Sequence, residues 1–152
     1  MVYGDIKVSN PKVTPNKLFN LLDQNKIKEA KNLYPILDSS QEVSREDIFF
    51  NGLYNSNSLN RMSQLLMEKQ KYDAALVPLE WALSLDPKHP NNHDNIAEFY
   101  IKTGNTAKAI EHSQMALKYL ATFNHPNKQF IEAIRNASEK RINSIENSKN
   151  EN

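Results

Sequence analysis

The stretch at residues 59–85 decides the fold, because its pattern returns at residues 93–119. The first copy reads LNRMSQLLMEKQKYDAALVPLEWALSL, and the second reads HDNIAEFYIKTGNTAKAIEHSQMALKY. Seven small or apolar positions recur 34 residues later: Met62, Ser63, Leu66, Ala75, Leu76, Ala82 and Leu83 return as Ile96, Ala97, Tyr100, Ala109, Ile110, Ala116 and Leu117. A period of about 34 residues with this spacing predicts stacked helical hairpins.

The composition agrees with one small helical domain. The chain has 152 residues, of which 39% are hydrophobic and three are glycine. Few glycines argue against a β-sandwich with many tight turns. A lean hydrophobic fraction suits an elongated stack, since each layer buries only the faces that touch its neighbours. We therefore expect an all-α fold of stacked antiparallel helical hairpins with a C-terminal capping helix.

Charge and cysteine content argue against several classes of function. With 19 basic and 18 acidic residues, the formal net charge is +1, which gives no general attraction to nucleic acid or anionic membrane. The chain has no cysteine and therefore no disulfide framework or thiolate metal site. No stretch approaches the roughly 20 apolar residues of a membrane span, and the N-terminus lacks a signal-peptide core. We expect a cytoplasmic protein.

The flanks of the two copies divide the chain further. Thr14 followed by Pro15 favours a helix start, and the run from Ile27 to Ala30 echoes the run from Tyr72 to Ala75, which suggests a third, degenerate hairpin. The expected parts are an extended lead-in at 1–13, the degenerate N-terminal hairpin and a linker at 14–55, the two repeats at 56–123, the capping helix at 124–147 and a frayed tail at 148–152.

Helix boundaries follow from turn residues and apolar spacing. We expect helices near residues 59–68, 73–85, 92–102, 106–120 and 127–147. Gly104 separates the helices of the second hairpin, where a positive φ angle costs glycine little. On the last helix, Phe130, Ile134, Ala137 and Ile145 mark the apolar face, and we expect Lys140 and Arg141 on its outer side.

This spacing resembles the tetratricopeptide repeat, whose pattern is W-x2-L-G-x2-Y, then A-x3-F, then P. The first copy offers Leu59, Met62, Ser63, Leu66, Ala75, Leu79, Ala82 and Pro87, and the second offers His93, Ile96, Ala97, Tyr100, Ala109, Ser113 and Ala116. The opening tryptophan is absent from both copies, Ser113 replaces a large residue, and Ala121 stands where the closing proline would be. The resemblance implies a protein-binding function.

A narrower likeness concerns residues 59–63, 71–75, 94–100 and 102–105. These segments are similar to a hairpin appendage that ends some bacterial serine hydrolases, which implies a detached or partner form of that appendage. Hydrolase activity is not implied, because the sequence has no Gly-x-Ser-x-Gly elbow. The one Ser-x-x-Lys match, at residues 9–12, contains a proline that denies it the necessary helical turn.

Motifs for catalysis or for cofactor binding are missing from the sequence. It has no glycine-rich phosphate loop. His89 and His93 have the i, i+4 spacing of a metal pair, but Pro90 lies between them, so we expect no shared helical face. His93 replaces the opening aromatic residue of the repeat and is expected to pack, as is Trp81. We predict no enzymatic activity, no cofactor and no metal site.

The expected partner-binding site is a concave groove lined by the first helix of each hairpin. Residues at i, i+4 and i+7 share a helix face, and the face that packing leaves free carries Asn60, Gln64 and Met67 on one helix and Asp94, Glu98 and Ile101 on the other. Such a mixed surface could hold an extended peptide. The two carboxylates favour a neutral or basic ligand segment.

The leading functional hypothesis is therefore an adapter, scaffold or small chaperone that holds another protein or a peptide segment, and neither nucleic acid nor membrane. The first alternative is a regulatory or substrate-positioning subunit of a serine hydrolase encoded elsewhere. The second alternative is a secretion-type chaperone, which rests on architecture alone. The sequence leaves the partner and the oligomeric state open.

Overall fold

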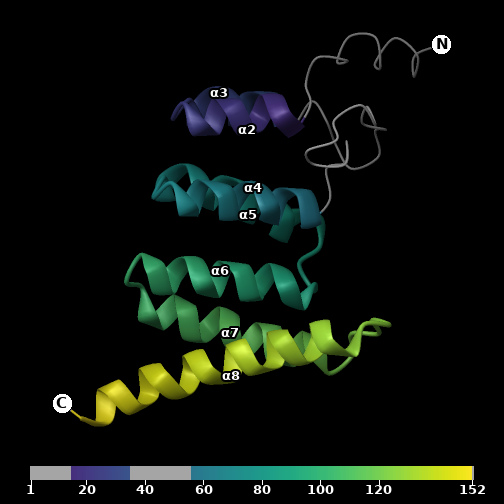
Figure 1. Cartoon of the computed structure of the whole chain (residues 1–152), viewed down its shortest axis with the longest axis vertical. Coiled ribbons are helices and arrows are strands. Elements are labelled where there is room, and N and C mark those ends of the chain that lie inside the picture. The colour runs from purple at the N-terminus through teal and green to yellow at the C-terminus, as the bar shows by residue number, and fades with distance from the viewer. Residues whose placement is uncertain (1–14, 35–55, 152) are drawn as a thin grey trace. The chain divides into compact units, whose positions relative to one another are not determined.

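The computed structural model of the chain describes residues 15–34 and 56–151. Within these ranges it contains seven helices and no strand, which confirms the all-α prediction (Figure 1). The expected lead-in at 1–13 and the linker ahead of the first repeat lie outside the described residues. The chain divides into two compact units, which we call unit 1 (Met1–Leu85) and unit 2 (Asp86–Asn152).

Unit 1 holds two pairs of helices. The first pair is α2 (Pro15–Asp23) with α3 (Ile27–Leu33), and the second is α4 (Ser56–Glu68) with α5 (Tyr72–Leu85). The pairs share a core, since α2 contacts both α4 and α5, and α3 contacts α5. Leucine dominates the fully enclosed positions, which include Leu18, Leu22, Leu59, Leu66 and Leu79. Removal of these side chains from water is the main favourable contribution to folding here.

The lone tryptophan also joins the two helix pairs of unit 1. Trp81 on α5 lies against Tyr34, which follows α3, with ring centroids 4.0 Å apart and planes 6° apart. Both residues are half-buried, and desolvation raises the pKa of Tyr34 to about 12. Trp81 therefore packs inside the unit, as we expected, but its side chain is only half-buried.

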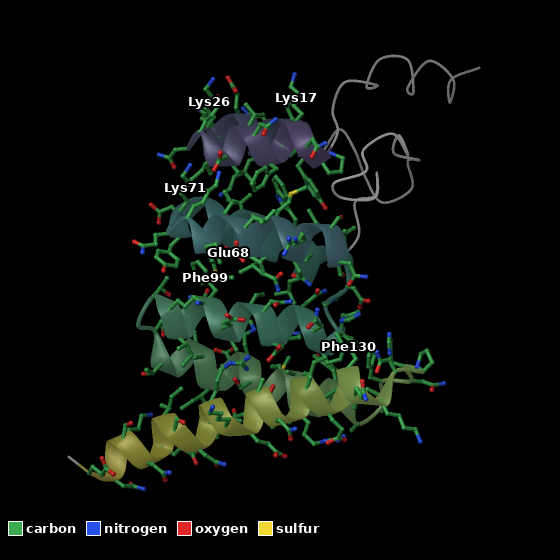
Figure 2. All side chains as sticks on the ribbon, in the orientation of Figure 1. Lys17, Lys26, Glu68, Lys71, Phe99 and Phe130 are labelled. Atoms are coloured by element: carbon green, nitrogen blue, oxygen red, sulfur yellow. The ribbon has the colours of Figure 1, made fainter. Side chains whose placement is uncertain are left out.

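The outer face of the α2–α3 pair is polar. Lys17 and Lys26 point from this pair into solvent (Figure 2).

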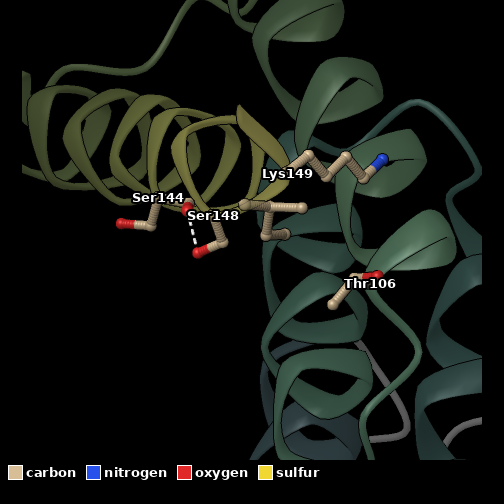
Figure 3. Close-up of a pocket in the computed structure, with 5 residues that line it drawn as sticks. Thr106, Ser144, Ser148 and Lys149 are labelled. Carbon is tan, nitrogen blue, oxygen red and sulfur yellow. Dashed lines mark hydrogen bonds between the residues drawn. The ribbon is translucent and has the colours of Figure 1, made fainter. Parts of the chain in front are cut away.

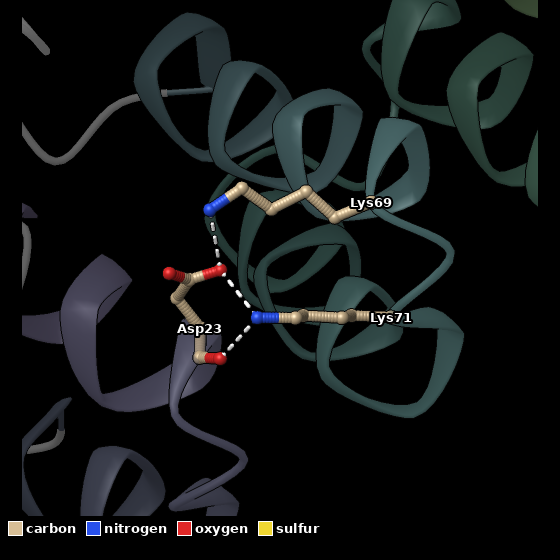
Figure 4. Close-up of polar contacts among 3 residues, drawn as sticks. All are labelled: Asp23, Lys69 and Lys71. Carbon is tan, nitrogen blue, oxygen red and sulfur yellow. Dashed lines mark hydrogen bonds and ion pairs between the residues drawn. The ribbon is translucent and has the colours of Figure 1, made fainter.

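A polar contact links the end of α2 to the turn between α4 and α5. Lys69 and Lys71 each place Nζ 2.8 Å from Oδ1 of Asp23, and Lys71 also donates to the backbone carbonyl of Asp23 (Figure 4). The hydrogen bonds from Lys69 and Lys71 lower the pKa of Asp23 from its ordinary value of 3.8. Partly exposed ion pairs contribute only about 0.2–1 kcal/mol each, and here they also complement the C-terminal dipole of α2.

Unit 2 consists of three helices: α6 (Pro90–Lys102), α7 (Thr106–Leu120) and α8 (Lys128–Asn150). α7 packs against both of the others, and α8 also contacts α6. Ala116, Leu120 and Ile134 form a buried cluster between α7 and α8, and Phe123 and Phe130 pack against it. Figure 2 labels Phe130 near the start of α8. The expected last helix is thus present, and it continues through Asn150 instead of ending at 147.

The same turn joins the helices of all three pairs. Asn25, Gln70 and Gly104 each adopt a positive φ angle, at 60°, 58° and 82°. In each case the amide of that residue donates to the carbonyl three residues earlier, and the next amide donates to the carbonyl five residues before it. This is the Schellman arrangement, which satisfies the last carbonyls of the preceding helix. Only Gly104 was expected at such a position, because the sequence offers glycine there and not in the other two turns.

The 34-residue period of the sequence is also a period of the structure. α4 and α6 both have 13 residues, and their first residues, Ser56 and Pro90, are 90 − 56 = 34 positions apart. α5 and α7 begin at Tyr72 and Thr106, again 106 − 72 = 34 apart. The equivalent small residues have no exposed surface in either copy: Ser63, Ala75 and Ala82 in the first, and Ala97, Ala109 and Ala116 in the second. Small side chains at these positions allow the paired helices to approach closely.

The start of α4 departs from the sequence-based expectation. α4 begins at Ser56 and not near Leu59, so Ser56, Asn57 and Ser58 form its first turn. Pro78 lies in the interior of α5 and is fully buried. Because proline has no amide hydrogen, it cannot donate to the carbonyl of Ala74. The helix nevertheless continues to Leu85.

Candidate functional site

The expected groove residues of unit 1 are mostly enclosed. Asn60 is 3% exposed and Met67 is 6% exposed, whereas Gln64 is half-buried. The expectation that packing leaves this face of α4 free is therefore wrong for Asn60 and Met67. Their side chains belong to the interior, and only Gln64 remains partly accessible to a partner.

In unit 2, Asp94 is engaged by α8. Nη2 of Arg141 lies 2.5 Å from Oδ1 of Asp94, and Nη1 donates to Oγ of Ser113 on α7 at 3.3 Å. Both charged side chains are about 85% enclosed, being 14% and 15% exposed. Burial raises the pKa of Asp94, and Arg141 opposes that shift. We expected Arg141 on the outer side of α8, and this expectation is wrong. Its side chain instead connects α8 to both α6 and α7.

Glu98 and Ile101 complete the expected face on α6, and both are accessible. Glu98 forms an exposed i, i+4 ion pair with Lys102 at 3.8 Å. Ile101 is 40% exposed and is the one large hydrophobic residue that is exposed in the described part of the chain. An isolated apolar side chain on a surface is common and has no meaning by itself. Its surroundings therefore decide whether it marks a site.

A three-residue turn joins the end of α6, near Ile101, to the start of α7. A cleft lies at this start of α7. The cleft has a volume of about 290 Å³ and is formed by Thr106 at the start of α7 and by the last turns of α8 (Figure 3). Ile145 supplies an apolar floor and is 8% exposed. Ser144, Ser148 and Lys149 supply polar groups at the rim, and Oγ of Ser148 donates to the carbonyl of Ser144.

We call Glu98, Ile101 and the residues of this cleft the turn-end surface of unit 2. The cleft contributes an apolar floor, hydroxyl groups and one lysine, whereas Glu98 and Ile101 lie near the end of α6 and do not line it. The sequence predicted Glu98 and Ile101 but not the cleft, because the cleft depends on how the last turns of α8 cross the start of α7.

A cluster of rings in unit 2 was also missed. His93 and His112 face each other across α6 and α7, with their Nδ1 atoms 3.1 Å apart, and the rings of Tyr100 and Tyr119 lie beside them. The repeat contains a signal for this contact, because positions 93 and 112 correspond to Leu59 and Pro78 in the first copy (93 − 34 and 112 − 34), which are both fully buried. The prediction that His93 packs is confirmed, since it is 4% exposed.

The described residues contain no group of three or more histidine, aspartate or glutamate side chains that could hold a metal ion. Among the same residues, no helix combines the length and apolar character needed to cross a membrane. The chain matches no protein-family model, and a comparison with curated proteins finds no significant match.

Proposed function

We propose that the chain is a non-enzymatic protein-interaction module built like a tetratricopeptide array, with three helical hairpins and α8 as a cap. The support comes from the turns, because the same hydrogen-bonded turn with a positive φ angle occurs after α2, α4 and α6. Three such hairpins are about the minimum that a stable repeat array needs. Arrays of this kind present continuous surfaces to extended partners.

The occupant that fits best is a peptide segment of another protein that carries an apolar side chain. The single observation behind this choice is the exposed side chain of Ile101, which lies one residue before the end of α6 in the unit that also holds the cleft. A polar rim around an apolar centre is typical of protein-binding surfaces. The apolar side chain would enter the cleft, and the backbone of the segment would meet the hydroxyl groups at its rim.

The contacts of Asp94 and Glu98 change the expected charge of the partner segment. We expected Asp94 and Glu98 to favour a neutral or basic segment. However, Arg141 neutralises Asp94, and Lys102 is paired with Glu98. These carboxylates therefore give little preference for a basic ligand, and we propose that the apolar anchor and not charge selects the segment. The affinity of such a complex should depend only weakly on salt, since exposed charges contribute little to it.

The experiment that tests this function uses peptides selected from a random displayed library on the immobilised chain. Ile101→Glu is expected to weaken the binding of the selected peptides about tenfold, because it places a charge where an apolar contact formed, at a cost of about 1.4 kcal/mol. Fluorescence polarisation with a labelled peptide gives the dissociation constant of each variant.

Gln114→Glu is the matched control, since Gln114 is exposed on α7 of the same unit and the substitution adds the same charge. It should leave binding within about twofold of the original. Equal binding to both variants would remove the turn-end surface from the proposal. Ester hydrolysis by the purified chain would contradict the assignment as a non-enzymatic module.

A further inference from the structure

All four histidines of the chain lie in unit 2, at positions 89, 93, 112 and 125, and unit 1 has none. Histidine is the side chain whose ordinary pKa lies in the weakly acidic range. The groups that change charge between about pH 8 and about pH 5 are therefore concentrated in one half of the chain. His93 and His112 differ from the other two, since they form a hydrogen bond between two helices.

The hydrogen bonds of the pair determine where its protons lie. Nε2 of His93 is 2.8 Å from the carbonyl oxygen of Pro87, which can only accept, so this nitrogen carries a hydrogen. In a neutral His93 the other nitrogen, Nδ1, is then bare and accepts. Its partner is Nδ1 of His112 at 3.1 Å, which must therefore donate. The neutral pair has one possible arrangement, with hydrogen on Nε2 of His93 and on Nδ1 of His112.

Protonation affects the two rings differently. A proton on Nε2 of His112 leaves its Nδ1 as the donor, so the bond between the helices survives. A further proton on His93 must go to Nδ1, where two N–H groups would then face each other at 3.1 Å. The doubly protonated pair thus has no hydrogen bond and carries two like charges in contact, which low-dielectric surroundings make costly.

Other charged groups around the pair do not offset this effect. On α7, Glu111 and Lys108 act on His112 in opposite directions, and burial is the main reason that its pKa is lowered. Burial likewise lowers the pKa of His93. From α8, Arg141 reaches Asp94 and Ser113, the residues next to the two histidines in sequence, and it neutralises the carboxylate of Asp94. Tyr100 and Tyr119 present rings to the pair.

The geometry points to an acid-responsive switch in unit 2: protonation of both His93 and His112 separates α6 from α7, while unit 1 stays closed. The sign of the pH dependence agrees with this. Because folding lowers the pKa of both imidazoles, the unfolded state binds more protons at mildly acidic pH. Stability is then complete well above about pH 6.5 and falls as the pH drops below that value toward the folded-state pKa.

Hydrogen exchange of the full-length chain, followed by mass spectrometry at about pH 8 and about pH 5.5 with a chelator present, tests the switch. After correction for intrinsic exchange rates, protection in α6 and α7 is expected to fall about tenfold or more. Protection in α4 and α5 should change by less than about twofold. An equal loss in both units, or no loss in either, would overturn the proposal.

Two further measurements assign the effect to the pair. His112→Gln should remove most of the response, because the amide cannot take up a proton and can turn its oxygen toward a protonated His93. His125→Gln, which leaves the pair intact, should keep the response, and the reverse ranking of these variants would contradict the proposal. Long-range 1H–15N spectra of the unmodified chain at about pH 8 should show hydrogen on Nε2 of His93 and on Nδ1 of His112, and any other combination refutes the mechanism.

Discussion

Arg141→Ala is expected to destabilise unit 2 by about 3 kcal/mol, because it leaves the carboxylate of Asp94 enclosed without its partner. Asp94 is only 15% exposed, and among the described residues its ion-pair partner is Arg141. The substitution also removes the donor to Ser113 and with it a connection from α8 to α7. The expected loss of about 3 kcal/mol lies at the low end of the range for breaking a buried ion pair, since both side chains retain some contact with water. Urea unfolding followed by circular dichroism measures the loss.

The loss should depend on pH in a defined direction. Burial already raises the pKa of Asp94, and removal of Arg141 raises it further. As the pH falls through that raised value, Asp94 becomes neutral in the folded state and the penalty disappears. The difference in stability between Arg141→Ala and the original chain should therefore shrink on acidification. The pH-dependent contribution of His93 and His112 to stability cancels in this difference, because both proteins contain these residues.

Two controls separate the buried charge from other effects. Arg135 is paired with Glu132 on the same helix, but these side chains are 38% and 56% exposed, so Arg135→Ala should cost less than about 0.5 kcal/mol. The double variant Asp94→Leu with Arg141→Met should recover most of the stability, since no charge is left unpaired. A loss in the double variant as large as that in Arg141→Ala would mean that packing, and not charge, explains the result.

Ala109→Leu is the second substitution with a large expected effect. Ala109 has no exposed surface and lies in the first turns of α7. A leucine there inserts three heavy atoms into a space that a single methyl group fills. Overpacking of this kind costs about 1–3 kcal/mol. Ala75, the equivalent residue of the first copy, should respond in the same way, because it is equally enclosed.

Ala107→Leu provides the comparison on the same helix. Ala107 is exposed, so leucine there meets no neighbour and should change the free energy of unfolding by less than about 0.5 kcal/mol. Thermal unfolding by circular dichroism ranks the three variants. If Ala109→Leu and Ala107→Leu have the same stability, the close approach of the helices at the small residues is not a feature of the fold.

Much of the fold could be predicted because the repeat is a local property of the sequence. The spacing of small residues places the helices of both copies, and α7 has the expected bounds. The turn at Gln70 could not be foreseen in the same way, since glutamine gives no sign of a positive φ angle. It adopts one because the two helices around it must pack and the last carbonyls of α4 need partners.

The candidate site was harder to predict, because it depends on contacts between helices that are far apart in the sequence. Periodicity shows that Asp94, Glu98 and Ile101 share a face of α6, but not that Arg141 from α8 covers one end of that face. In the same way, no motif connects His93 to His112, which are 19 positions apart. Of the three residues on this face of α6, Glu98 and Ile101 remain accessible. The cleft beside the start of α7 forms only once the last turns of α8 are in place.

The measurement that tests the central claim most directly is site-specific photo-crosslinking with a photoreactive amino acid at position 101 and, in a separate protein, at position 114. If the chain holds a protein segment on the turn-end surface of unit 2, position 101 should crosslink a selected peptide with high yield. Position 114, which is exposed on α7, should give little crosslinked product. Equal yields at both positions, or a higher yield at position 114, would contradict the assignment of that surface as the binding site.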